Sequence, residues 1–212
     1  MKKRLFPIAY MFLLTFFFTA VVSAVKEISE DRIAINQRVK LQRIVLKVLG
    51  IHGAEGTAPQ EVAQLFARRI REIEVRERSL YIGYSEDGRT ITGYAFAVSG
   101  QGFWGPILGL AAVDPSATEV LGVAFFKHSE TPGLGARITE DWFTKQFKGL
   151  ALHPIRAEEK LFRLKAAGTG RGPNELDAVT GATGTSRAVE AFLNRELDHF
   201  LEATWPAVKK KG

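Results

Sequence analysis

Hydrophobic residues follow several distinct patterns along this chain, and the first is a continuous run near the start. Residues 5–25 are uncharged and mostly apolar, and they follow the basic sequence Lys2-Lys3-Arg4. A helix needs about 20 apolar residues to cross a hydrocarbon core, so the run predicts a transmembrane anchor. By the positive-inside rule, the basic start stays in the cytoplasm and everything after about residue 26 lies outside the inner membrane.

A cleaved signal peptide is the alternative interpretation of the same run. Val22-Ser23-Ala24 resembles a small-residue cleavage site. The apolar stretch is longer than the usual signal core of about 7–15 residues, which favours a retained anchor. Both alternatives export the rest of the chain.

Helical spacing of apolar residues appears next, in two segments. The first covers residues 31–49 and continues the anchor as a stalk, with Gly50 placed to end it. The second begins at Thr57, with Gln60 at the spacing of a capping box and with apolar positions on one side. Those positions are Val62, Leu65, Phe66 and Ile70.

Strand patterns dominate the middle of the chain. Residues 79–84 and 90–99 flank a turn at Glu86-Asp87-Gly88, which predicts a hairpin. Residues 107–113 and 118–127 form a second pair joined around Asp114-Pro115. The sequence therefore predicts an α+β fold: an antiparallel sheet flanked by helices.

Later segments return to helices. A helix is expected over residues 138–147, with Trp142, Phe143 and Phe147 facing the core, and Phe162 and Leu164 suggest a further strand. The glycine-rich loop at residues 168–173 lacks the Lys-Ser/Thr of a P-loop and the spacing of a dinucleotide fingerprint. It is interpreted as the approach to the next segment.

Composition and charge exclude several classes of function. The 212 residues contain no Cys, which excludes disulfides, thiolate zinc sites and Cys-ligated iron–sulfur clusters. The net charge of +6 comes partly from the basic ends, at residues 2–4 and 209–211, so it does not indicate a nucleic-acid-binding face. The histidines, His52, His128, His153 and His199, are too far apart to suggest a metal site.

Residues 177–186 carry the most informative chemistry. This small, hydroxylated segment precedes a helix whose apolar positions begin at Ala188, so it lies at a helix N-terminus, where unpaired NH groups and the macrodipole attract anions. The small residues Gly181, Ala182 and Gly184 allow a phosphate to approach the main chain. The hydroxyl groups of Thr183, Thr185 and Ser186 add hydrogen-bond donors. The alternative is that Thr183 or Thr185 only caps the helix.

Two further stretches carry candidate binding residues. Residues 128–135 leave a strand and turn at Pro132-Gly133, where glycines give backbone freedom, although an ordinary Pro-Gly loop is the alternative. In residues 102–106, Phe103 and Trp104 stand between glycines. They offer either a stacking surface for a planar ring or ordinary core packing.

Two motifs in order carry a resemblance to a known family. Asp177-x-x-Thr180-Gly181-Ala182-Thr183 resembles the Asp-x-x-Ser/Thr-Gly-Ala-Thr signature of the FMN-binding domains that flavin transferase modifies, and residues 130–135 resemble their Glu-Thr-Pro-Gly-Leu-Gly loop. Nearly the whole chain resembles the G subunit of Rnf-type ion-translocating electron-transport complexes. It is similar to the C subunit of sodium-pumping NADH:quinone reductase, and its length favours the Rnf type.

The resemblance implies a covalent cofactor. Thr183 would carry FMN through a phosphoester, Thr180, Gly181 and Ala182 would shape the attachment turn, and Asp177 would serve the transferase. Thr185 and Ser186 continue the signature. The residues that would line the isoalloxazine ring are Glu130, Thr131, Gly133, Leu134 and Gly135.

The implied function is electron transfer within a membrane complex whose other subunits move ions. The expected organisation is a basic start and anchor at 1–26, a helical stalk at 27–56, an FMN-binding domain at 57–205 on the periplasmic side, and a basic tail at 206–212. Its partners would be the other subunits, and flavin transferase during maturation. One alternative is a free-standing exported flavoprotein or a subunit of another respiratory complex. The other is a membrane-anchored binding or assembly module without flavin.

Overall fold

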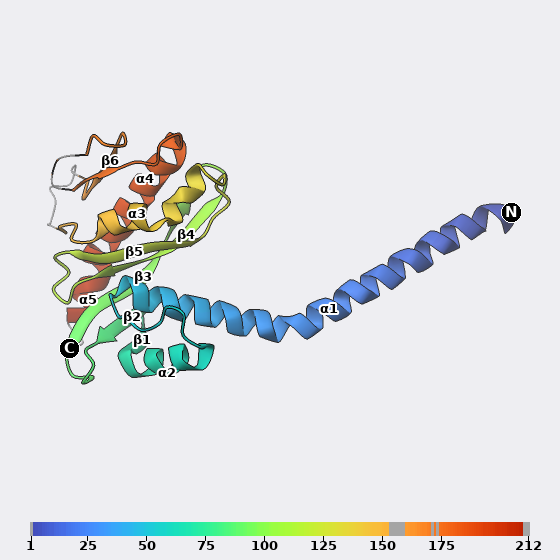
Figure 1. The fold of residues 1–212 in the computed structure, drawn as a ribbon, viewed down its shortest axis with the longest axis horizontal. Coiled ribbons are helices and arrows are strands. Elements are labelled where there is room, and N and C mark those ends of the chain that lie inside the picture. Colours follow the sequence, from blue (N-terminus) through green and yellow to red (C-terminus); the bar gives the residue numbers. More distant parts are fainter. Residues whose placement is uncertain (1, 153–159, 171, 173, 210–212) are drawn as a thin grey trace. The chain divides into compact units, whose positions relative to one another are not determined.

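The computed structural model describes residues 2–152, 160–170, 172 and 174–209. Two compact units make up the chain, residues 1–41 and residues 42–212. The first helix, α1 (Lys2–Val48), begins in the first unit and ends in the second (Figure 1). Parts of three sequence predictions lie outside the described residues. They are residues 210–212 of the basic tail, residues 171 and 173 of the glycine-rich loop, and His153.

The first unit is an exposed helical segment that is apolar enough to cross a membrane. Phe6–Glu30 has a mean hydropathy of 2.2, and none of it is buried inside the protein. Most of its large side chains, among them Phe12 and Phe16, are more than half exposed to solvent. A run of exposed Phe, Leu and Val costs free energy in water, so this helix fits a membrane anchor.

The end of α1 follows the sequence prediction closely. Gly50 has a φ of +69°, a conformation that glycine adopts without strain. The amide of Ile51 donates to Leu46 O at 2.9 Å and that of Gly50 donates to Lys47 O at 3.0 Å, which is the pattern of a Schellman motif. Gly50 therefore ends the helix, as its position predicted.

A five-stranded antiparallel sheet forms the centre of the second unit (Figure 1). Its strands lie side by side in sequence order, so each connection is a local hairpin. Both predicted strand pairs and the turn around Gly88 are confirmed. The strands are β1 (Ile70–Val75), β2 (Arg78–Tyr84), β3 (Ile91–Gln101), β4 (Pro106–Val113) and β5 (Val120–Lys127).

Two details around α2 (Pro59–Arg69) differ from the sequence prediction. Thr57 does not cap this helix, because its hydroxyl donates to Gly53 O at 2.9 Å and the N-cap residue, Ala58, makes no side-chain cap bond. Pro59 begins the helix instead, since its fixed φ suits the first position. Ile70 starts β1, a strand that the helical apolar pattern concealed.

Helix α4 (Thr183–His199) covers one face of the sheet, and the end of α1 packs against the other. On the first face, Phe96 stacks on Phe200 with ring centroids 4.3 Å apart, and Phe192 lies edge-on to Phe125. On the other face a Cβ on Gly122 would lie 2.7 Å from Val48 O. Glycine at this position therefore lets the helix approach the sheet closely.

The expected helix over residues 138–147 is a chain of short helices. The elements are η1 (Gly135–Thr139), α3 (Asp141–Thr144) and η2 (Lys145–Phe147). Phe143 and Phe147 are fully buried, as predicted, but Trp142 is 38% exposed and its indole donates to Glu140. The prediction for Trp142 was wrong because the breaks between the short helices turn it away from the core.

A small parallel pair lies beside the main sheet. It consists of β6 (Arg163–Lys165), which confirms the strand expected around Leu164, and β7 (Glu175–Asp177). After α4 the chain continues through a π-helical turn, η3 (Phe200–Thr204), into α5 (Trp205–Lys209). Because β7 leads into the turn before α4, the pair fixes the approach to the helix that carries the hydroxyl cluster.

Candidate functional site

Three loops meet at the N-terminus of α4. They are the β3–β4 connection at residues 102–105, the β5–η1 connection at residues 128–134, and the turn at residues 179–182. Glu130 joins them: its Oε1 accepts from Trp104 N at 3.0 Å and its Oε2 accepts from Thr185 Oγ1 at 2.5 Å. The two motifs that are far apart in sequence are therefore adjacent in the fold.

Thr183 is the first residue of α4 and its side chain is exposed. The chain enters the helix through a turn in which Ala182 N donates to Val179 O at 3.0 Å and Gly181 has a φ of +76°. The N-cap residue makes no side-chain cap bond. The alternative that Thr183 or Thr185 only caps the helix is therefore wrong, and the Thr183 hydroxyl lies among the free NH groups of the first turn.

Thr185 and Ser186 lie beneath this surface. Thr185 is 3% exposed and Ser186 is 2% exposed. Thr185 donates to Glu130, while Ser186 Oγ accepts from Val179 N at 3.1 Å. Thr185 thus holds the Glu130 loop against α4, and Ser186 holds the turn at residues 179–182. Both hydroxyls support the exposed surface of the site from the protein interior.

The loop that begins at Glu130 presents both buried and exposed residues. Glu130 is only 4% exposed, whereas Thr131, Gly133 and Leu134 are exposed. Gly133 has a φ of +74°. Gly135 is buried, and a Cβ there would lie 2.5 Å from Thr185 Oγ1. The loop can therefore approach α4 only with glycine at this position.

Exposed apolar side chains lie beside the residues that flank Thr183. Phe103 is 61% exposed, Trp104 is 66% exposed and Leu134 is 44% exposed. Phe103 lies against Gly184, where a Cβ would be 2.4 Å from its ring, and Leu134 lies 3.1 Å from the Cβ position of Gly181. The core-packing alternative for Phe103 and Trp104 is therefore wrong.

These exposed rings offer a surface that a flat aromatic group would cover. Phe103 and Trp104 contact each other edge to face, with ring centroids 5.2 Å apart. Among the described residues of the second unit, the other large hydrophobic side chains that are exposed are Leu134 and Trp142, at 44% and 38%. A planar ring system tethered at Thr183 would remove such apolar surface from water, so these residues fit FMN.

Asp177 ends β7 and organises the preceding glycine-rich loop. Its Oδ1 accepts from Gly168 N at 2.8 Å and from Gly170 N at 3.3 Å. Gln146 holds the main chain of Asp177 from both sides, donating to its carbonyl at 3.2 Å and accepting from its amide at 2.7 Å. The carboxylate is thus already engaged with backbone before any partner binds.

The sequence interpretation missed one residue of this site, Gln146, and one contact, that of Gly184. Gln146 lies 31 residues from Asp177 along the chain, and no pattern connects them. Gly184 was recognised as small, but its contact with Phe103 depends on how the β3–β4 loop reaches α4. Within the described part of the chain, no group of three His, Asp or Glu side chains is placed to hold a metal ion.

The fold and the site together define a class of protein. Residues 102–198 match the FMN-binding domain family, and they include all three loops and most of α4. The match spans 97 of the 212 residues and contains the candidate site around Thr183.

Within this class, the chain is similar to the C subunit of Na(+)-translocating NADH-quinone reductases. The protein from Yersinia pestis is 29% identical over 108 residues, covering 51% of this chain and 41% of that protein. The protein from Chlamydia caviae is 44% identical over 111 residues, covering 45% of this chain and 35% of that protein. The matched stretch thus spans less than half of each relative.

Crystal structures of this reductase component share the fold. The one from Parabacteroides distasonis has a TM-score of 0.67 at 22% identity, and the similarity covers 80% of this chain and 93% of that one. NqrC from Shewanella oneidensis has a TM-score of 0.66 at 21% identity, covering 76% and 92%. The α+β prediction is confirmed.

Proposed function

We propose that this chain is an FMN-carrying electron-transfer subunit of a membrane-bound, ion-translocating oxidoreductase complex. The observation that carries the proposal is the position of Thr183: it is an exposed residue in the first turn of α4, and the exposed side chains of Phe103 and Leu134 contact the positions of its neighbours Gly184 and Gly181. The similarity to the C subunit of Na(+)-translocating NADH-quinone reductases supports the assignment to a complex. The Rnf-type complex is the finer proposal, and it rests on the resemblance of nearly the whole chain to the G subunit of such complexes.

The attachment would be a phosphoester at Thr183 Oγ1. A new bond joins this oxygen to the FMN phosphorus, and the hydroxyl proton departs with the leaving group of the activated flavin phosphate that flavin transferase supplies. Relative to free FMN, the product has lost one water. The NH groups at the start of α4 would hold the phosphate oxygens, and the positive end of the helix dipole favours their charge.

The bound flavin would supply the redox chemistry, and the protein would supply position and environment. Leu134, Gly133 and Thr131 would lie along one side of the ring system, with Phe103 and Trp104 offering aromatic contact. Glu130 and Gly135 would act from below, by fixing the loop to Thr185. Covalent attachment would keep the cofactor from being lost outside the cytoplasm.

The decisive experiment is flavin labelling of the full chain, co-produced with flavin transferase. Wild type should give a fluorescent band on a denaturing gel and an intact mass raised by one FMN less one water. Thr183→Ala should give neither and Thr183→Ser should retain both. Thr90→Ala, at an exposed position of the β2–β3 connection and outside the site, serves as the hydroxyl control. An unlabelled wild type, with the transferase active on another substrate, would instead support a binding module without flavin.

Co-purification tests the membrane complex. The labelled full chain should be isolated with integral membrane redox subunits, whose identification by mass spectrometry separates an Rnf-type complex from a sodium-pumping quinone reductase. Recovery of a labelled chain alone, from membranes solubilised under conditions that preserve known complexes, would support the free-standing flavoprotein.

The proposed arrangement in the membrane has a single span with the flavin domain on the periplasmic side. Residues 1–26 would form the basic start and anchor, and the FMN-binding domain would lie within residues 57–205; residues 42–56 belong to the compact second unit. Because the chain has no Cys, Glu86→Cys in an exposed turn provides a single reporter. A membrane-impermeant thiol reagent should label it in cells with a permeabilised outer membrane, whereas labelling only after lysis would place the domain in the cytoplasm.

A further inference from the structure

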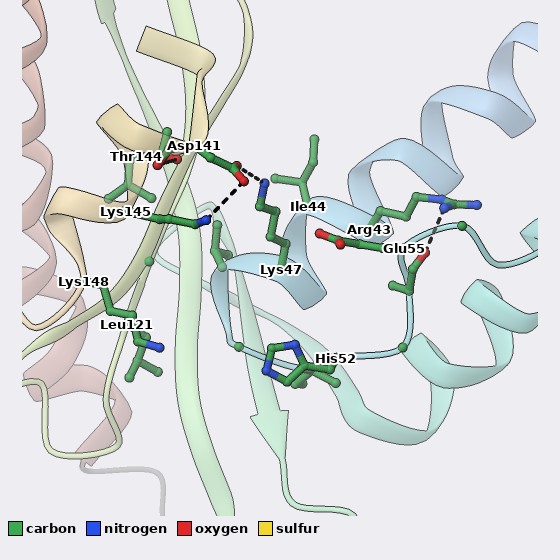
Figure 2. A pocket seen from close by; sticks show the side chains of 18 residues that line it. Arg43, Ile44, Lys47, His52, Glu55, Leu121, Asp141, Thr144, Lys145 and Lys148 are labelled. Carbon is green, nitrogen blue, oxygen red and sulfur yellow. Dashed lines mark hydrogen bonds and ion pairs between the residues drawn. The ribbon is translucent and has the colours of Figure 1, made fainter.

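A cavity of about 880 Å³ lies within the second unit. Figure 2 shows the residues that line it, and Thr183 is not one of them. It is formed by the end of α1, the segment at residues 50–56, the start of β5, and the α3–η2 region. The Glu130 loop follows the other end of β5, so the cavity and the flavin site lie at opposite ends of this strand. Its volume is in the range of small-molecule sites.

Cationic side chains outnumber anionic ones around this cavity. Lys47 Nζ and Lys145 Nζ converge on one carboxylate, Asp141, at 2.8 and 3.5 Å (Figure 2). The hydrogen bond and charge of Lys47, together with Lys145, hold the pKa of Asp141 below its ordinary value. One carboxylate thus serves two ammonium groups. The charged lining residues are Arg43, Lys47, Lys145 and Lys148, against Glu55 and Asp141.

Two of the cations have no carboxylate partner among the described residues. Lys148 follows η2 and is exposed at the cavity, and its ammonium group makes no hydrogen bond or ion pair with the described residues. Arg43 donates to the carbonyls of Ala54 at 2.8 Å and Thr57 at 2.5 Å. Neutral carbonyls fix the guanidinium without cancelling its charge, so the cavity keeps a positive surplus.

Apolar side chains line the same cavity. Val48, Ile51 and Val123 are at least nine-tenths buried and contribute to its wall, together with Ile44 and Leu121. The cavity therefore offers an apolar wall beside lysines whose long, flexible stems can deliver a point charge. Lysine is a common binder of phosphate in this role.

We propose that this cavity is a second anion-binding site, which takes a phosphate group attached to an apolar or organic body. The phosphate would sit between Lys145 and Lys148, and the body would lie against Val48, Leu121 and Val123. The phosphate could belong to the headgroup of an anionic phospholipid or to a soluble phosphate ester, since the chemistry of recognition is the same. The site is separate from the flavin and does not depend on it.

The test uses the full chain in neutral detergent. One arm titrates glycerol 3-phosphate by calorimetry at constant ionic strength, and the other adds phosphatidylglycerol or phosphatidylcholine and counts bound lipid by native mass spectrometry. Saturable binding of one glycerol 3-phosphate per chain would show that a soluble phosphate ester is enough to occupy the site. Retention of phosphatidylglycerol but not phosphatidylcholine, without binding of the soluble ester, identifies the lipid as the source.

A pair of neutralising variants locates the binding. Lys145→Gln with Lys148→Gln should weaken binding of the responding probe at least tenfold. Arg71→Gln with Arg89→Gln removes the same charge from exposed positions outside the cavity and should leave binding within twofold of wild type. A cooperative urea-unfolding transition like that of wild type, followed by tryptophan fluorescence, confirms that both double variants are folded. The proposal is overturned if neither probe binds wild type saturably, or if both double variants lose affinity equally.

Discussion

Thr185 Oγ1 donates a hydrogen bond of 2.5 Å to Glu130 Oε2, although the two residues are 55 positions apart in the chain. Both side chains are almost fully buried, at 3% and 4% exposure. The same carboxylate accepts from Trp104 N on its other oxygen. One buried side chain therefore fastens the aromatic loop and the Glu130 loop to the first turn of α4.

This contact predicts strong energetic coupling between the two residues. Glu130→Ala, Thr185→Val and the double variant form a cycle, and the coupling free energy should be about 1.5–3 kcal/mol, as expected for a hydrogen bond to a carboxylate. Urea unfolding of the full chain in detergent, followed by tryptophan fluorescence, measures it. A cycle between Glu130→Ala and Thr139→Val, whose hydroxyl bonds Ala136 O instead, should be additive. Additivity in the first cycle would show that the contact contributes nothing.

Gly184 should control the aromatic side of the flavin site. A Cβ at this position would lie 2.4 Å from the Phe103 ring, so Gly184→Ala must displace the ring. Alanine is the better helix former by about 1 kcal/mol, so the variant should be at least as stable as wild type while the emission spectrum of the attached flavin shifts.

The Phe103→Ala background provides the control for that variant. With the ring absent, adding Gly184→Ala should cause no further spectral change. A spectrum of Gly184→Ala that is identical to wild type would mean that Phe103 does not contact the flavin.

Two substitutions of Asp177 separate its possible roles. Its Oδ1 accepts from Gly168 N and Gly170 N, and asparagine can preserve these acceptor contacts while removing the charge. If the carboxylate serves the transferase, Asp177→Asn and Asp177→Ala should both lose covalent flavin on the denaturing gel. Full labelling of Asp177→Asn with reduced labelling of Asp177→Ala would restrict the residue to organising the loop.

Asp114 gives the β4–β5 connection a pH-dependent contribution. Partial burial raises the pKa of its carboxyl, but bonds from the amides of Glu119, Ser116 and Thr118 outweigh it and leave the pKa below the ordinary value. A group whose pKa is lower in the folded state stabilises above its unfolded pKa, about 3.9, and this contribution is lost as the pH falls through the folded pKa.

Asp114→Ala should therefore destabilise the full chain at pH 7 by about 1–2 kcal/mol. The difference from wild type should shrink below about pH 4, where the unfolded carboxyl is protonated. Urea unfolding at pH 7 and pH 3 tests this, with exposed Glu86→Ala as the matched carboxylate control. A difference that stays constant across this range would assign the effect to packing rather than to the charge.

Much of this fold is local, and the sequence predicts it for that reason. The span, the end of α1 at Gly50 and both hairpins depend on periodicity and on single turn residues, whose effects extend over a few neighbours. The two predictions that were wrong around α2, the Thr57 cap and the helical assignment of Ile70, also have local causes. Pro59 displaced Thr57 from the cap, and β1 continued an apolar pattern that equally suited a helix.

The two motifs predicted the flavin site and, as a hypothesis, its covalent residue. This was possible because a helix N-terminus and a run of small residues are recognisable from the local sequence. Only the tertiary structure decided which hydroxyl is exposed and which is buried: Thr183 reaches solvent, whereas Thr185 bonds Glu130. It also decided that Phe103 and Trp104 line the surface and that Gln146 holds Asp177. These relationships join residues far apart in sequence, and their energies depend on packing across the whole domain, which no local pattern encodes.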